Sequence, residues 1–225
     1  MHRLLTLFAA SALAVPALAQ TTVNEPGSGV AFPVSLMVAD GSTQVLTGTG
    51  LRTRTVLGVK VYAFGLYVDE AAARTALASF AGRPPAELER DATFYENVLR
   101  MSFPMSLRLV MTRNVTGEQM GEAFDGALRP RVVAAAARNM PGGEAALETF
   151  RGFFSLDRLT EGAELVFTCT PSGTLNSSVS GERKAAIESR ALCWALFDVY
   201  LGRNPISAGG KRTVIARFPA ILAGR

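Results

Sequence analysis

The stretch GTGLRTRTVLGVKVYAFGLYVDE, residues 48–70, decides the fold. Within it, Val59–Val68 is apolar at both odd and even positions, which is typical of a strand buried on both faces. Gly58 permits a tight turn, so the preceding segment, Gln44–Leu57, is expected to lie beside it as a second strand. Arg52 is expected near the start of the first of these two strands, which is otherwise uncharged until Arg54. The sequence therefore predicts a central strand with a guanidinium on its neighbour.

The first residues have the features of an export signal. A basic start at Arg3 precedes an almost wholly apolar run, and Ala17-Leu18-Ala19 has the small-x-small pattern of a signal-peptidase site. The run is broken by Pro16 and is too short for a membrane anchor. We expect residues 1–19 to be a signal peptide and residues 20–225 to be one exported domain, periplasmic or secreted, with no stable membrane anchor.

Composition excludes several classes of function. The 23 Lys and Arg residues against 19 Asp and Glu are scattered and form no basic run, so we expect no nucleic-acid partner. His2 is the only histidine and lies in the expected signal peptide. The exported chain then has no imidazole for a Ser-His-Asp or Cys-His pair, or for a zinc, copper or haem site. Cys169 and Cys193 alone are too few for a cysteine metal site, so we expect no metal and no other cofactor.

The rest of the chain alternates between groups of strands and groups of helices. This grouping predicts an α+β fold in which a large antiparallel sheet is covered by a layer of helices. The expected strands are Val34–Val38, Asn97–Thr112 and a hairpin of Ala163–Thr170 with Thr174–Ser180. The first expected helix is Asp69–Ala81, stopped by Pro84-Pro85. A second helix is opened by a Thr116/Gln119 capping box and is bent or ended at Pro130. The last two are Lys184–Leu201, capped by Gly202, and Gly209–Leu222.

The two cysteines lie on elements that are expected to meet. Cys169 is on the first strand of the hairpin, and Cys193 is on the helix expected to cover it. Export permits oxidation to a disulfide. A reduced cysteine is also a common core residue, so both states remain open from the sequence.

Several blocks of the sequence resemble the chalcone isomerase family in order and spacing. They are residues 48–70, then LVMTRNVTGEQMGEAF (109–124), AELVFTCTPSGTLNSS (163–178) and AIESRALCWALFDVYLGRNPIS (186–207). The resemblance covers most of the exported chain. It implies a large antiparallel sheet backed by helices, with a ligand cleft between the two layers.

The resemblance also implies roles for particular residues. True isomerases use an arginine, which Arg52 matches, with a threonine, a tyrosine and an asparagine; here Tyr62 stands near the threonine position, Met120 at the tyrosine position and Ala127 at the asparagine position. Fatty-acid-binding members pair the arginine with a tyrosine on the next strand, which Arg52 and Tyr62 match. The resemblance thus favours fatty-acid binding over flavonoid cyclisation.

Arg52 and Tyr62 are the candidate ligand-binding residues on physical grounds as well. A guanidinium in an apolar cleft is costly unless an anion neutralises it, and its planar fork suits a carboxylate. We expect Gly48 and Gly50 to keep the backbone beside Arg52 uncrowded. Flexible methionines, Met101, Met111 and Met120, offer apolar surface for an acyl chain. The alternatives are that Arg52 pairs with Asp69 or Glu122 or points to solvent, and that Tyr62 and the methionines are ordinary core residues.

Three hypotheses for function follow. The first is an exported protein that binds a fatty acid or another hydrophobic carboxylate. The second is an isomerase or intramolecular lyase acting on a phenolic or enone substrate, with Arg52 and Tyr62 as catalytic residues. The third is a non-catalytic interaction protein that has kept the fold and lost the cleft.

Overall fold

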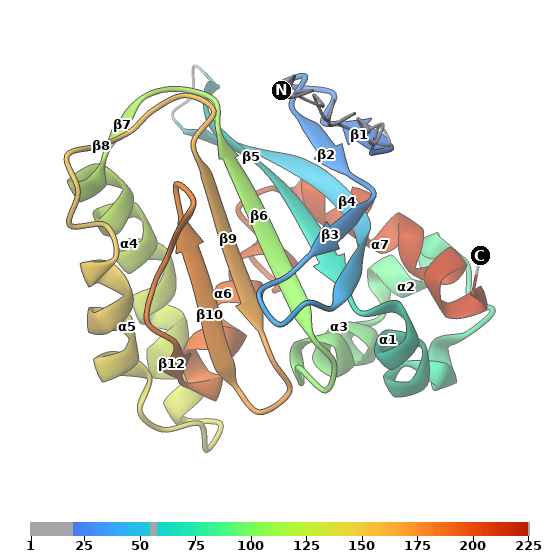
Figure 1. The fold of residues 1–225 in the computed structure, drawn as a ribbon. Coiled ribbons are helices and arrows are strands. Elements are labelled where there is room, and N and C mark those ends of the chain that lie inside the picture. The colour runs from blue at the N-terminus through green and yellow to red at the C-terminus, as the bar shows by residue number, and fades with distance from the viewer. Residues whose placement is uncertain (1–19, 55–57, 225) are drawn as a thin grey trace, which may run out of the picture.

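An antiparallel sheet is the main layer of the molecule, and one of its two faces is covered by helices (Figure 1). The computed structural model describes residues 20–54 and 58–224, so the expected signal peptide and Leu57 lie outside the described residues. In this part of the chain no helix is long and apolar enough to cross a bilayer. The predicted α+β fold with a large antiparallel sheet and a helix layer is confirmed.

The eight strands of this sheet follow the order β11-β10-β9-β6-β5-β4-β3, with β12 also paired to β10. They are β3 (Ser35–Met37), β4 (Thr43–Arg54), β5 (Val59–Val68), β6 (Met105–Met111), β9 (Glu164–Cys169), β10 (Thr174–Val179), β11 (Glu182–Arg183) and β12 (Ile187–Glu188). Two short antiparallel pairs lie outside it: β1 (Thr22–Asn24) with β2 (Ala31–Pro33), and β7 (Val115–Thr116) with β8 (Arg158–Leu159).

The helices form the second layer. They are α1 (Glu70–Ala76), α2 (Pro85–Arg90), α3 (Ala92–Leu99), α4 (Gly117–Ala136), α5 (Gly143–Gly152), α6 (Arg190–Leu201) and α7 (Ala208–Ala223), with a 3-10 turn at Ala78–Phe80. Helix α7 packs on β4, while α4 and α5 lie side by side near the other edge of the sheet, with α6 between them and α3 (Figure 1). A functional cavity can therefore form where α4, α6 and the sheet meet.

The predicted central strand is confirmed. Strand β5 lies between β4 and β6 and is buried from Tyr62 to Val68. The main core lies between this sheet and the helices, and Trp194 on α6 is only 7% exposed within it. A smaller cluster around Phe32 and Tyr67 lies on the opposite face. Burial of both faces explains the continuous apolar run that the sequence showed.

The capping box and the hairpin are also confirmed. Thr116 accepts a hydrogen bond from the backbone N–H of Gln119, whose side chain accepts one from the backbone N–H of Thr116. Strands β9 and β10 pair antiparallel as expected. Cys169 on β9 and Cys193 on α6 form a disulfide, with their Cα atoms 5.9 Å apart. Of the two states left open by the sequence, the structure has the bridged one.

Two expected elements were wrong at their N-terminal ends. The segment expected to be extended from Asn97 begins instead as the end of α3, because Asp91 caps that helix and Phe94 and Val98 bury one helical face. The strand starts only at Met105. The helix expected from Lys184 starts at Arg190, where Ser189 accepts a hydrogen bond from the N–H of Leu192. Of the residues before it, Ile187 and Glu188 form β12, and β11 ends at Arg183.

Two helix ends expected near prolines were wrong: the end that was one of the two alternatives at Pro130, and the end of the helix before Pro84-Pro85. Helix α4 continues through Pro130 to Ala136. The carbonyl of Gly126 loses its helical hydrogen bond to the proline, but Gly126 is exposed and water can replace the lost donor. The helix expected over Asp69–Ala81 ends at Ala76, and Pro85 begins α2 instead of only stopping a helix, since proline is well suited to the first helical turn.

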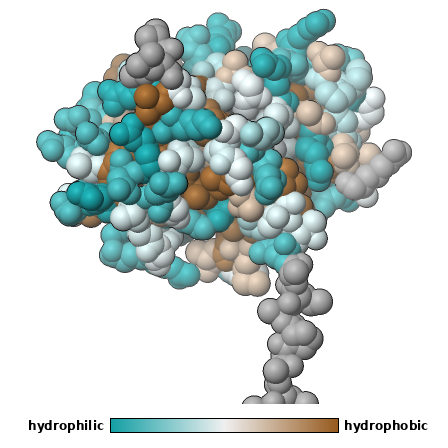
Figure 2. All heavy atoms as spheres, turned by 90° about the horizontal axis from the view of Figure 1, so that it is seen from above, coloured by the Kyte–Doolittle hydropathy of each residue, from teal (hydrophilic) through white to brown (hydrophobic). Residues whose placement is uncertain are grey.

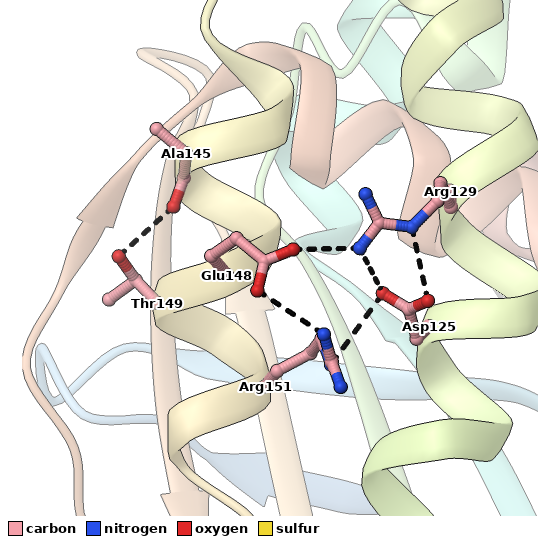
Figure 3. A network of polar contacts seen from close by, with 6 residues as sticks. All are labelled: Asp125, Arg129, Ala145, Glu148, Thr149 and Arg151. Carbon is pink, nitrogen blue, oxygen red and sulfur yellow. Dashed lines mark hydrogen bonds and ion pairs between the residues drawn. The ribbon is translucent and has the colours of Figure 1, made fainter.

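Helices α4 and α5 are joined on their outer sides by a network of ion pairs (Figure 3). The Arg129 guanidinium contacts Asp125 at 2.6 Å and Glu148 at 2.7 Å, and Arg151 approaches the same two carboxylates. Hydrogen bonds from Arg129 hold the pKa of both carboxyl groups below their ordinary values. The network's contribution is therefore present above the pKa of the unfolded carboxyls and is lost as the pH falls, and it is small because these groups are solvated.

Candidate functional site

A cavity of about 630 Å³ lies between the ends of β4 and β5, helix α4 and the C-terminal part of α6. This volume is in the range of sites for small organic ligands. Arg52 and Tyr62 both line it and are direct register partners on the two neighbouring strands. The antiparallel pairing of the two strands thus brings them together as the sequence predicted. Arg52 lies near the end of β4, which begins at Thr43, and not near the start of its strand.

Arg52 is partly buried, and no carboxylate of the described residues lies within 4 Å of it. The alternative partners do not engage it: Asp69 caps helix α1 by accepting from the N–H of Ala72, and Glu122 lines the cavity without forming an ion pair in the described structure. The cavity therefore presents a guanidinium whose charge no described acidic side chain neutralises.

Three further arginines line the cavity. Arg54 and Arg113 are exposed and, within the described residues, also lack a carboxylate partner. Arg131 is engaged: its Nε lies 2.8 Å from Asp198, and it donates to the carbonyls of Ala127 and Asn204. Glu122 is the one acidic residue among those described as lining the cavity. The potential at this site is accordingly positive and favours an anionic ligand.

The hydroxyl of Tyr62 has a partner that sequence reasoning missed. It lies 3.1 Å from the hydroxyl of Tyr200 on α6, and both side chains are buried. Burial raises the pKa of both tyrosines, while the positive charge of Arg52 acts in the opposite direction on each. Two neutral hydroxyls therefore sit beside the guanidinium. The only signal for Tyr200 in the sequence was its place on the apolar face of α6.

The three candidate methionines do not share one place. Met120, on α4, lines the cavity. Met111 is the register partner of Tyr62 on β6 and is buried in the core, but it is not a lining residue. Met101 precedes β6, whose first residue lies opposite Val68, so it belongs to the other end of the sheet. Antiparallel pairing separates Met101 from the site, which its sequence position alone did not reveal.

The remaining walls are largely apolar. The apolar lining residues from strands and helices include Val59, Val61, Phe124, Ala127 and Val199. Seen from above, the molecule shows patches of hydrophobic residues between hydrophilic ones (Figure 2). In the described part of the chain, no three His, Cys, Asp or Glu side chains come together as metal ligands would. The arrangement can hold an apolar body with one anionic end.

Comparison with known proteins gives consistent matches over most of the chain. A family model described as chalcone isomerase-like matches residues 26–214. A chalcone–flavanone isomerase of Oryza sativa is 33% identical over 206 residues, covering 86% of this chain and 88% of the relative. Fatty-acid-binding protein 2 of Arabidopsis thaliana is 31% identical over 206 residues, covering 88% of this chain and 51% of the relative.

The fold itself matches a solved structure. The crystal structure of an Arabidopsis thaliana fatty-acid binding protein superimposes with a TM-score of 0.77 over 90% of this chain and 100% of that chain, at 22% sequence identity. This agreement is one of architecture, the same curled antiparallel sheet covered by helices.

Proposed function

Because this chain belongs to the chalcone isomerase-like family, whose relatives include fatty-acid-binding proteins, we propose that it binds a fatty acid or another hydrophobic carboxylate in the cavity at Arg52. The observation that carries the proposal is the guanidinium of Arg52, which lines an apolar cavity without a carboxylate partner among the described residues. A bound carboxylate would supply the missing charge.

The physical argument rests on the cost of an unpaired charge. A partly desolvated guanidinium without a counter-ion is unfavourable, and a carboxylate can accept two parallel hydrogen bonds from it. Arg54 and Arg113, which also line the cavity, would attract the anion electrostatically. The Tyr62–Tyr200 hydroxyl pair offers a further hydrogen-bond donor. The acyl chain would then lie along the apolar walls beside Met120.

Family membership leaves catalysis open, because relatives include both isomerases and fatty-acid-binding proteins. The lining of the cavity favours binding. Met120 and Ala127 line it at the places where the resemblance to true isomerases implies a tyrosine and an asparagine. Neither side chain can donate a hydrogen bond to a ketone or orient a water. Lost transition-state donors cost about 10²–10³ in rate each, so we expect chalcone cyclisation to be absent or very slow.

We also propose that the protein acts in the periplasm or outside the cell. The proposal rests on the basic and apolar N-terminal residues and on the small-x-small site at residues 17–19. The Cys169–Cys193 disulfide is compatible with an oxidising compartment. N-terminal sequencing of the protein recovered from its host would test this: a mature chain starting near Gln20 supports export, and an intact Met1 contradicts it.

The binding proposal is tested by calorimetry with dodecanoate on purified, delipidated protein. Arg52→Ala should weaken binding by about 2–5 kcal/mol, the usual cost of truncating one partner of a buried charge pair. Tyr62→Phe should weaken it by about 0.5–1.5 kcal/mol, the value of one hydrogen bond. Arg183→Ala is the matched control, because Arg183 is exposed on β11 and does not line the cavity.

The outcomes separate the three hypotheses for function. Weaker dodecanoate binding by Arg52→Ala but not by Arg183→Ala supports the proposal. Equal binding by wild type and Arg52→Ala overturns it. It is also overturned if dodecanoate binds neither to the wild type nor to any of the variants. Turnover of a chalcone that is abolished by Arg52→Ala would establish an isomerase instead.

A further inference from the structure

A second groove, separate from the cavity at Arg52, lies on the other side of helix α6. It has a volume of about 580 Å³ and is lined by residues of α3, α6 and α7 and by the segment after α4. Trp194, Asp198 and Leu201 face it from α6, whereas Val199 faces the Arg52 cavity. Positions 194, 198 and 201 recur at helical spacing, so α6 presents one face to each hollow. The ion pair between Arg131 and Asp198 lies between the two.

The groove is strongly basic. Six cationic side chains line it, against two acidic ones, Glu96 and Asp198. The cations are Arg90, Arg100, Arg138, Arg190, Arg203 and Lys211. Within the described residues none of the six forms an ion pair with a carboxylate, and the charge of Asp198 is already compensated by Arg131 at 2.8 Å. The groove therefore has uncompensated positive charge.

Lys211 is the least exposed of the six cationic side chains that line the groove. Its Nζ donates to the carbonyl of Gly202 at 2.8 Å and lies 3.7 Å from the centre of the Tyr95 ring. Burial lowers the pKa of Lys211, with the carboxylates of Asp198 and Glu89 acting in the opposite direction. An ammonium held in a desolvated position is stabilised by a nearby anion.

The floor of the groove is apolar and aromatic. Tyr95, Leu99, Met140, Trp194 and Leu201 line it. The Arg138 guanidinium lies 4.9 Å from the centre of a Trp194 ring. The Tyr95 hydroxyl is itself buried and has no hydrogen-bond partner within the described residues, so Tyr95 contributes its ring to the floor. The apolar floor of the groove suits the apolar part of an amphipathic anion, and the cationic side chains around it suit the charged headgroup.

We propose that this groove is a second binding site, for a single amphipathic anion whose phosphate or carboxylate headgroup meets Lys211 and the surrounding arginines and whose apolar body lies against Tyr95 and Trp194. The site is independent of the proposed function of the Arg52 cavity, because the two hollows share no lining residue. Its volume is adequate for a small organic molecule. A membrane surface fits less well: the large hydrophobic residues found exposed in the described chain, Val23, Met37 and Val133, do not line the groove.

The experiment uses Trp194 as a reporter, since it is the only tryptophan of the chain and lines the groove. Its fluorescence is titrated with dodecyl phosphate, dodecanoate, inorganic phosphate, the neutral detergent dodecyl maltoside and vesicles of anionic phospholipid. We expect a saturable change with the first two probes and none with the maltoside. A response to dodecyl phosphate but not to inorganic phosphate shows that the apolar body contributes to recognition.

Two variants locate the binding. Lys211→Gln should weaken the fluorescence-detected binding at least about tenfold, as expected for loss of a hydrogen bond to a charged group. Arg217→Gln is the matched control, because it removes an exposed cation from the same helix outside the groove. Circular dichroism of both variants verifies folding. Should Lys211→Gln fail to fold, Arg138→Gln, which changes an exposed arginine, is titrated instead.

Arg52→Ala distinguishes the two sites, because it should weaken dodecanoate binding in the cavity and leave the Trp194 response intact. A Trp194 response that disappears in Arg52→Ala and persists in Lys211→Gln would overturn the proposal, since the reporter would then be sensing the cavity. It is also overturned if no monomeric anion changes the fluorescence, if dodecyl maltoside acts equally well, or if only vesicles of anionic phospholipid give a response.

Discussion

The pair of buried hydroxyls at Tyr62 and Tyr200 shows how much depends on single residues in this fold. Each hydroxyl is the other's hydrogen-bond partner at 3.1 Å, and both side chains are buried. The ring of Tyr200 also packs edge-on against Phe64, 4.8 Å between ring centres. A buried polar group is tolerated because it is paired, so each hydroxyl is needed mainly because the other is present.

We therefore expect Tyr200→Phe to lower the free energy of unfolding by about 1–3 kcal/mol, because it leaves the Tyr62 hydroxyl buried without a partner. The double variant Tyr62→Phe/Tyr200→Phe should be less destabilised than the sum of the two single changes, since it leaves no hydroxyl unpaired. Urea unfolding of the four proteins measures this coupling. Tyr95→Phe is the control, as its hydroxyl has no partner in the described structure. Strict additivity would contradict the pairing.

At the scale of elements, the glycines of β4 determine how α7 packs. A Cβ atom at Gly48 would lie 2.6 Å from the backbone of Thr213, and one at Gly50 would lie 2.6 Å from the Cα of Gly210. The hydroxyl of Thr213 donates to the carbonyl of Thr49 across the same contact. The expectation that Gly48 and Gly50 keep the backbone beside Arg52 uncrowded was wrong. The space beside these glycines is filled by α7, which their lack of a side chain allows to lie directly on the strand.

Gly48→Ala should accordingly destabilise the protein by about 1–3 kcal/mol, since the new methyl group meets helix backbone that cannot rotate away and α7 must shift. Gly126→Ala is the matched control: it adds the same methyl group inside α4, where nothing lies within 4 Å. That control should gain about 0.5–1 kcal/mol from the higher helix propensity of alanine. Chemical denaturation compares the two. A Gly48→Ala protein as stable as wild type would refute the close packing of α7 on β4.

At the scale of the whole molecule, the tyrosines link folding to alkaline pH. The chain has four, and burial raises the pKa of each, for Tyr95 to about 12. In the unfolded chain a tyrosine ionises near pH 10. Below that pH both states are protonated and the stability is fully present. Above it the unfolded chain releases protons that the folded chain retains, so stability falls as the pH rises.

We expect tyrosinate absorbance to appear well above pH 10 and to rise together with the loss of far-ultraviolet circular dichroism, in one transition. Parallel absorbance and dichroism titrations of the wild-type protein measure this. Free N-acetyltyrosine amide in the same buffers provides the reference midpoint. A tyrosinate signal with a midpoint near 10 while the dichroism is unchanged would show that the tyrosines are accessible in the folded state, contrary to their observed burial.

The sequence by itself determined those features that depend on residues close together in the chain. Apolarity on both faces predicted β5, the Thr116/Gln119 pattern predicted the start of α4, and a turn between two alternating runs predicted the β9–β10 hairpin. It also placed Arg52 and Tyr62 together, because the turn expected at Gly58 predicts that their strands pair antiparallel, as they do. A helix end at Pro130 and a helix start at Lys184 did not occur, because exposure in the first case and a competing cap in the second decide the outcome.

Only the tertiary structure decided what surrounds those residues. Tyr200 reaches Tyr62 across 138 positions of the chain, and no local pattern encodes that contact. The absence of a carboxylate beside Arg52 among the described residues, and the meeting of three helices around Lys211, follow from how the layers pack. Helix and strand patterns are set by neighbours a few positions away, whereas a site is set by side chains that distant segments bring into contact, and this is the part that the sequence does not specify locally.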